Sequence, residues 1–110
     1  MPFEIFKTES GKFAFRLKAG NGQIILASQT YESRSSVETG VISVIENSEK
    51  GESAFEKLTA KDGSPYFNMK AANGQVIGKS EMYTSESARD NGIASVIKNA
   101  AVKEINDLTG

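Results

Sequence analysis

The sequence predicts an α+β protein in which a tandem duplication of a β-β-β-α unit forms one six-stranded, mainly antiparallel sheet with two helices packed on one face. Three observations lead to this fold class. The sequence matches itself without a gap at an offset of 52 residues. Apolar and polar residues alternate through the first part of each copy, as in half-buried strands. The last part of each copy changes to a helical period.

The internal repeat is clearest in two stretches. Residues 18–25 fall on residues 70–77, and Ser43-Val44-Ile45 falls on Ser95-Val96-Ile97. A single unit of about fifty residues buries too little surface to be stable alone, so we expect the two copies to share one core. The organisation that follows is a single domain, 1–110, made of repeat one at 3–50, a linker at about 48–53, repeat two at 55–102 and a tail at 103–110.

Three strands are expected in each copy, joined by tight turns. They lie at roughly 3–8, 13–18 and 23–28, and at 55–59, 66–70 and 75–80. Pro65 stands where Phe13 stood, which predicts that its strand begins late or lies at an edge. Asn21-Gly22 and Asn73-Gly74 predict two-residue hairpin turns of type I′, in which both central residues have positive φ.

A helix is expected at the end of each copy. The apolar stripes are Val37, Val41, Val44 and Ile45, and Ile93, Val96, Ile97 and Ala100. Ser33 and Ser85 are the expected N-caps, and Asn47 and Asn99 are placed where a left-handed residue would end each helix. Gly40 and Gly92 fall inside the helices, which predicts a close approach to the helix backbone there. The tail is expected to extend the second helix or to fray.

Three sequence motifs recur in both copies and resemble one known family. They are Lys-Ala-x-Asn-Gly-Gln-(Val/Ile)-Ile at 70–77, Ser-x-x-Tyr-x-Ser at 80–85 and Gly-Ile-x-Ser-Val at 92–96, with counterparts at 18–25, 28–33 and 40–44. The chain resembles the duplicated branch of the uncharacterised YegP-like family. The resemblance implies two β₃α repeats in a single sheet, with the C-terminal helices exchanged between repeats. It also implies that single-copy relatives form the same body as dimers, so this chain is expected to be a monomer. It implies no activity.

Composition excludes several classes of function. The chain has no cysteine and no histidine, which removes thiolate metal sites and the commonest general base. Its 13 basic and 14 acidic residues give a net charge of −1, which argues against general binding to nucleic acid or anionic membranes. No catalytic, cofactor-binding or metal-binding residues are predicted, and no cofactor. The N-terminus lacks the features of a signal peptide and no stretch is long and apolar enough to span a membrane, so a cytoplasmic protein is expected.

The expected interaction surface depends on the type of hairpin turn. With two-residue turns, Lys18 faces Ile25 and Lys70 faces Ile77, on the side opposite the helices. A loop longer by one residue would reverse this parity. The predicted surface, mixed apolar and basic, consists of Arg16, Lys18, Ile25, Tyr66, Asn68, Lys70 and Ile77.

Three functions compete at this point. The leading hypothesis is a small non-enzymatic interaction module that uses the helix-free sheet face or an edge strand, with a protein as the expected partner. The alternative is weak single-stranded nucleic-acid binding through the same face, with Tyr66 stacking on bases. An enzyme is the third and least favoured, because a small two-layer domain offers little room for a deep polar pocket. Tyr31 and Tyr83, which recur at one repeat position, are expected to pack rather than to bind a ligand.

Overall fold

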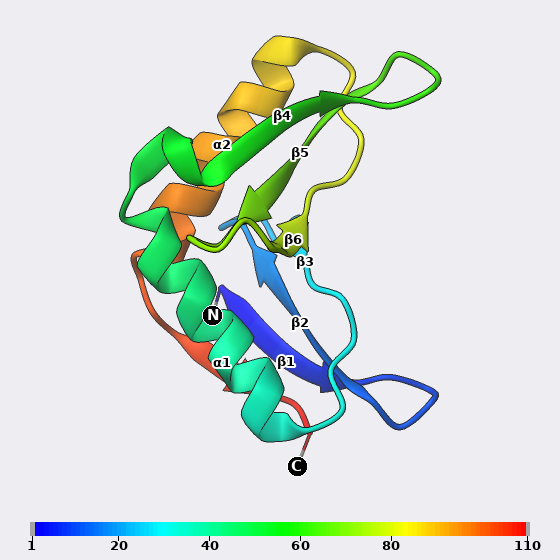
Figure 1. Ribbon diagram of the computed structural model, residues 1–110, viewed down its shortest axis with the longest axis vertical. Coiled ribbons are helices and arrows are strands. Elements are labelled where there is room, and N and C mark those ends of the chain that lie inside the picture. The colour runs from blue at the N-terminus through cyan, green and yellow to red at the C-terminus, as the bar shows by residue number, and fades with distance from the viewer. Residues whose placement is uncertain (1, 110) are drawn as a thin grey trace.

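One mixed sheet of seven strands runs through both repeats and carries two helices (Figure 1). The computed structural model describes residues 2–109. The strand order is β4-β5-β6-β3-β2-β1-β7, so the third strands of the two repeats meet at the centre. The elements are β1 (Phe3–Lys7), β2 (Phe13–Lys18), β3 (Ile24–Ala27), α1 (Arg34–Ser48), the 3₁₀ helix η1 (Gly51–Ala54), β4 (Phe55–Thr59), β5 (Pro65–Lys70), β6 (Val76–Lys79), α2 (Glu86–Ala100) and β7 (Ile105–Asp107).

The seventh strand comes from the tail, so the prediction of six strands was wrong by one. The tail neither extends α2 nor frays: β7 pairs with β1 in parallel, whereas all other strand pairs are antiparallel. The Phe3 N–H donates to the Glu104 carbonyl (3.1 Å), and the Leu108 N–H donates to the Ile5 carbonyl (2.8 Å). The outer edge of β1 offers unpaired backbone groups, and the tail satisfies them.

β5 begins at Pro65, the position equivalent to the first residue of β2, so the strand does not start late. It lies between β4 and β6 and not at an edge of the sheet, so both expectations for this proline were wrong. The reason is the direction in which the lost N–H would point. In repeat one, Phe13 and Tyr31 exchange two backbone hydrogen bonds of 2.9 and 2.6 Å. In repeat two, Pro65 keeps the acceptor half, taking a 2.8 Å bond from the Tyr83 N–H. The proline therefore removes one backbone hydrogen bond to the segment between β6 and α2, and it removes none of the hydrogen bonds between β5 and β4.

The hairpin turns are longer than the predicted type I′ turns. The Gly22 N–H donates to the Ala19 carbonyl, and the Ala19 N–H donates to the Gln23 carbonyl, both at 2.9 Å. Gly22 has φ of +85°, but Asn21 does not have positive φ, which excludes type I′. Instead, the Asn21 side chain accepts a 2.9 Å hydrogen bond from the Gln23 N–H. The second hairpin has the same arrangement, with positive φ at Gly74 alone.

A bulge follows from this longer loop and sets which residues of β3 are buried. Lys18 pairs with Ile24 and Leu17 pairs with Leu26, so Ile25 is an extra residue in β3. Residues at a bulge depart from strict alternation. Both Ile25 and Leu26 are buried in the core as a result.

The N-caps are confirmed, but the helix ends are not where they were predicted. The Ser33 Oγ accepts from the Ser36 N–H (3.1 Å), and the Ser85 Oγ accepts from the Ala88 N–H (3.0 Å). Asn47 and Asn99 are helical instead of left-handed. Their side-chain amides donate to the carbonyls four residues earlier, each at 2.8 Å. A side chain that satisfies a helical carbonyl lets the helix continue past this point.

The chain leaves each helix through a left-handed residue a few positions later. These residues are Gly51, with φ of +72°, and Lys103, with φ of +63°. They are equivalent across the 52-residue offset. Only the first is a glycine, the residue that adopts this conformation without steric cost.

The close approach predicted at the helix glycines is confirmed, and the twin tyrosines make it. A Cβ on Gly40 would lie 2.6 Å from the Tyr31 hydroxyl oxygen. A Cβ on Gly92 would lie 2.7 Å from Cζ of Tyr83. The Tyr83 ring stacks on Phe67 at a centroid distance of 6.2 Å, and the first repeat has the same stack at 6.4 Å. Both tyrosines therefore pack between the sheet and a helix, as expected.

Each helix contacts strands of both repeats. α1 packs on β1 and β2 of its own repeat and reaches β6, while α2 packs on β5 and reaches β2 and β3. The helices are thus shared between the repeats and not exchanged outright, which corrects what the family resemblance implied. The largest core side chains are Phe3, Ile5, Phe15, Leu17, Leu26, Val37, Val41, Val44, Phe67, Met69, Ile93 and Val96.

Candidate interaction face

The side of the sheet away from the helices is the candidate site, and we call it the helix-free face. Its side chains alternate along the strands with those of the core. They are Glu4, Phe6, Ala14, Arg16, Lys18, Ile24, Ala27, Glu56, Leu58, Tyr66, Asn68, Lys70, Val76 and Lys79. Five residues of the predicted surface lie here: Arg16, Lys18, Tyr66, Asn68 and Lys70.

Ile25 and Ile77 do not lie on this face, and their predicted placement was wrong. They are 4% and 8% exposed and belong to the core. The longer turn and its bulge shift the register, so that Ile24 and Val76 take the positions opposite the two lysines. The sequence alone could not reveal this, because one extra residue in a turn changes which side chains share a face.

In the first repeat, the carboxylate of Glu4 forms ion pairs with both cations of the face, Arg16 and Lys18. The Glu4 Oε1 lies 2.6 Å from Nε of Arg16 and 3.3 Å from Nζ of Lys18. The guanidinium of Arg16 also lies 4.5 Å from the centroid of the Phe6 ring, a cation–π contact. The hydrogen bond from Arg16 lowers the pKa of Glu4 and outweighs partial burial, which alone would raise it; Lys18 lowers it further.

The second repeat arranges its charges differently. Nζ of Lys70 lies 3.1 Å from Glu56, which is the counterpart of the Lys18–Glu4 pair. Asn68 replaces the arginine, and its buried Oδ1 has no hydrogen-bond partner. Lys79 lies over the Tyr66 ring with its Nζ 5.2 Å from the centroid. Among residues 2–109, Lys79 forms no ion pair, so its charge remains available to a partner.

A hollow lies where the two repeats meet. β3 and β6 are joined through one residue pair, Ala27 with Lys79, so the sheet opens on either side of it. The hollow has a volume of about 390 Å³. Its lining consists of Ala27, Ser28, Gln29, Val76, Ile77, Gly78, Lys79 and Ser80. Sequence reasoning missed Lys79 and Val76. These residues are three positions apart, and only the bulge at Ile77 places both on the helix-free face, so strict alternation could not find them together.

Two further properties concern the described residues as a whole. Between residues 2 and 109, no group of three or more histidine, cysteine, aspartate or glutamate side chains is placed to hold a metal ion. No helix in the same part of the chain has the length and apolarity that crossing a membrane requires.

The fold and the repeated motifs define a tandem-repeat α+β protein with one sheet shared by two β₃α units. The chain belongs to the family described as Domain of unknown function (DUF1508), whose model matches it twice, over residues 9–53 and 60–107. This confirms the family indicated by the motifs and the duplication.

Relatives of nearly the same length match the whole chain. The UPF0339 protein YegP of Escherichia coli K12 is 48% identical over 107 residues, which is 97% of this chain and 96% of that protein. A UPF0339 protein of Acinetobacter baylyi is 49% identical over 108 residues, covering 98% and 96%. The solution NMR structure of UPF0339 protein SO3888 from Shewanella oneidensis superposes with a TM-score of 0.91 at 48% identity, covering 99% of this chain and 93% of that one. No activity is assigned by the names of these relatives.

Proposed function

We propose that this protein is a non-enzymatic interaction module that binds an acidic partner protein across its helix-free face. The observation that carries the proposal is the position of Lys79. Its ammonium group lies over an aromatic ring, forms no ion pair within residues 2–109, and borders the hollow at the centre of the sheet. A cation held in this way is oriented for a carboxylate on a partner without a competing carboxylate of its own.

The surroundings of Lys79 support the same conclusion. The helix-free face, as defined above, carries four cations and two carboxylates, although the chain as a whole has a net charge of −1. Val76 is 43% exposed beside the hollow and gives the face an apolar element. Apolar surface bordered by an excess of positive charge is suited to a protein partner of the opposite charge.

Single-stranded nucleic acid is the second candidate for the same face, and the observed contacts weaken it. Arg16 and Lys18 share Glu4, and Lys70 is paired with Glu56, so three of the four cations already have a carboxylate partner. One face of the Tyr66 ring, the only aromatic platform of repeat two on this surface, is covered by Lys79. Binding through stacking and phosphate contacts would have to displace these interactions.

The test is a titration of ¹⁵N-labelled protein with an octaglutamate peptide, and separately with a thymine decanucleotide, at low salt. We expect the peptide to shift the amides of residues 76–80, with an effect that falls as salt rises because the attraction is between charges. Lys79→Glu should abolish these shifts. Lys61→Glu, which reverses a cation in the turn between β4 and β5, is the matched control and should retain them.

Two results would contradict the proposal. Shifts produced by the oligonucleotide and not by the peptide would favour nucleic-acid binding instead. Equal loss of peptide binding in both variants would mean that net charge alone, and not the helix-free face, controls the interaction.

A further inference from the structure

The tail covers the outer edge of β1 only in part. The residues of β1 that direct their backbone N–H and C=O groups away from β2 are Phe3, Ile5 and Lys7. The Phe3 N–H donates to the Glu104 carbonyl (3.1 Å), and the Ile5 carbonyl accepts from the Leu108 N–H (2.8 Å). No residue between 2 and 109 forms a backbone hydrogen bond with the outward groups of Lys7. The edge therefore continues beyond the end of β7.

β7 is held mainly by backbone hydrogen bonds and surface charges. None of residues 101–109 is buried, and the one apolar side chain of β7, Ile105, is 41% exposed. The Asp107 carboxylate lies 3.0 Å from Nη2 of Arg34 at the start of α1, but both side chains are well exposed, where an ion pair stabilises little. The chain enters β7 through Lys103, a non-glycine residue with φ of +63°. A strand with no buried side chain and a strained entry opens at low cost.

Two cations border this edge, and the tail pairs with only one of them. In the register of β1 and β7, Asp107 lies opposite Ile5, so a strand that continued would bring position 109 opposite Lys7. The tail has the neutral Thr109 there, whose hydroxyl accepts a 3.1 Å hydrogen bond from Nε of Arg34. Lys7 forms no ion pair within residues 2–109. The edge therefore has a positive charge that β7 does not use.

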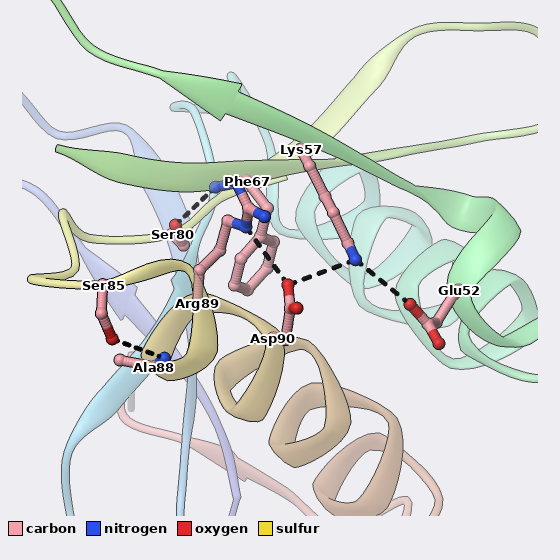
Figure 2. Close-up of polar contacts among 8 residues, drawn as sticks. All are labelled: Glu52, Lys57, Phe67, Ser80, Ser85, Ala88, Arg89 and Asp90. Atoms are coloured by element: carbon pink, nitrogen blue, oxygen red, sulfur yellow. Dashed lines mark hydrogen bonds and ion pairs between the residues drawn. The ribbon is translucent and has the colours of Figure 1, made fainter. Parts of the chain in front are cut away.

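The equivalent edge of repeat two, on β4, lacks these features. The Phe55 N–H is already bonded to the Glu52 carbonyl of η1. Figure 2 shows Lys57 paired with Glu52, at 3.5 Å, and with a carboxylate of α2. Glu86 stands where repeat one has Arg34. The edge of β4 is thus an internal comparison, with the same fold but without the cations that are available beside β1.

We propose that the edge of β1 is a strand-binding site from which an extended segment of another protein, with two carboxylates two residues apart, displaces β7. The first carboxylate takes the place of Asp107 beside Arg34, and the second faces Lys7. Main-chain hydrogen bonds supply affinity and the carboxylates supply specificity. The tail competes at high effective concentration because it is part of the same chain. The incoming segment outcompetes it through the hydrogen bonds and the ion pair that it adds at Lys7. This site lies at the end of the sheet, apart from the helix-free face.

The probe is a synthetic peptide with the sequence of residues 103–110 and the change Thr109→Glu, which places the second carboxylate opposite Lys7. We expect this peptide to shift the amides of β1, including that of Lys7, in the ¹⁵N-labelled full chain. The amides of residues 105–107 should move toward the positions of an unstructured segment, because the tail is released. The unchanged peptide should bind more weakly, since it offers Lys7 no charge.

A charge exchange at Lys7 tests the specificity without altering the competing tail, which makes no ion pair with this lysine. Lys7→Glu should weaken binding of the Thr109→Glu peptide by about fivefold, the equivalent of about 1 kcal/mol for one charge pair. A Thr109→Lys peptide should bind the Lys7→Glu protein better than the wild type. Lys61→Glu, in the turn after β4, is the matched control and should bind as the wild type does. Lys7→Gln supplies a neutral variant should the reversed charge disturb folding.

Four results would overturn the proposal. The first is no response of the β1 amides at millimolar peptide. The second is a response confined to residues 76–80, which would assign the peptide to the helix-free face and leave the proposed function standing. The third is equal binding of both charged peptides to both proteins. The fourth is exchange of the tail between copies of the chain, seen as shifts that depend on protein concentration and not on peptide.

Discussion

Replacing Gly78 by alanine tests how the two repeats fit together at the centre of the sheet. Gly78 in β6 and Leu26 in β3 are equivalent positions, and they lie against each other on the core side. A Cβ on Gly78 would be 2.7 Å from Cγ of Leu26 and 2.8 and 2.9 Å from its two methyl carbons. Leu26 has no exposed surface, so its side chain cannot move into solvent to make room.

The expected cost follows from these distances. Overpacking a filled core by one methyl group costs about 1–3 kcal/mol, and alanine returns about 0.5–1 kcal/mol by restricting the unfolded chain. The free energy of unfolding of Gly78→Ala should therefore fall by about 0.5–2 kcal/mol. Urea denaturation followed by circular dichroism measures this, and each kcal/mol corresponds to about 4–8 °C in melting temperature for a domain of this size.

The double variant identifies the cause. Leu26→Ala alone leaves a cavity and should cost about 2–5 kcal/mol. In Leu26→Ala/Gly78→Ala the new methyl group no longer meets the leucine, so the total should be smaller than the sum by about 1–2 kcal/mol. If Gly78→Ala stays within 0.5 kcal/mol of the wild type, or if the two costs simply add, the two positions are not fitted to each other.

Three other changes have definite expected outcomes. Lys103→Gly should raise the free energy of unfolding by about 0.5–1 kcal/mol, because a glycine adopts the left-handed conformation without strain; thermal melts measure it, and a loss of stability would contradict it. Tyr83→Phe removes a buried hydroxyl that has no hydrogen-bond partner, so denaturant titration should show stability unchanged or raised by up to about 1 kcal/mol. A clear loss would mean that the hydroxyl is bonded in solution. Glu4→Gln should be less stable than the wild type at pH 7. The folded pKa of Glu4 is lowered, so its contribution is present above the unfolded value of about 4.3 and is lost as the pH falls through the folded value. The difference between the two proteins should therefore shrink in acid, and a gap independent of pH would exclude the ion pair as its cause.

Several local signals that act within one repeat were read correctly from the sequence. Strand alternation, the serine caps and the helix glycines each depend on residues close in the chain, and the duplication allowed every assignment to be made twice. The prediction that Gly40 and Gly92 mark close contacts was confirmed. A glycine inside a helix lowers stability relative to alanine, so its presence there indicates that a larger side chain would not fit.

The errors arose where one residue decides between two geometries. Asn-Gly is compatible with more than one hairpin loop, and the longer loop moved Ile25 to the core side and brought Ile24 to the helix-free face. The pairing of the tail with β1 joins the two ends of the chain, and a short polar segment carries no local sign of a partner so distant in sequence. Lys79 was missed because its importance depends on the junction of β3 and β6, which neither repeat specifies alone.

Ile5 lies in β1, which β7 covers, whereas its repeat counterpart Lys57 lies in β4, an outer edge of the sheet. This contrast has a consequence for how such a protein can evolve. In an assembly of two identical subunits, any mutation at this position appears at both ends, so both margins must be sealed or both left accessible. Covalent fusion of the halves removes that constraint. One margin can be sealed by the chain's own β7 segment, while the other is free to change its charge independently.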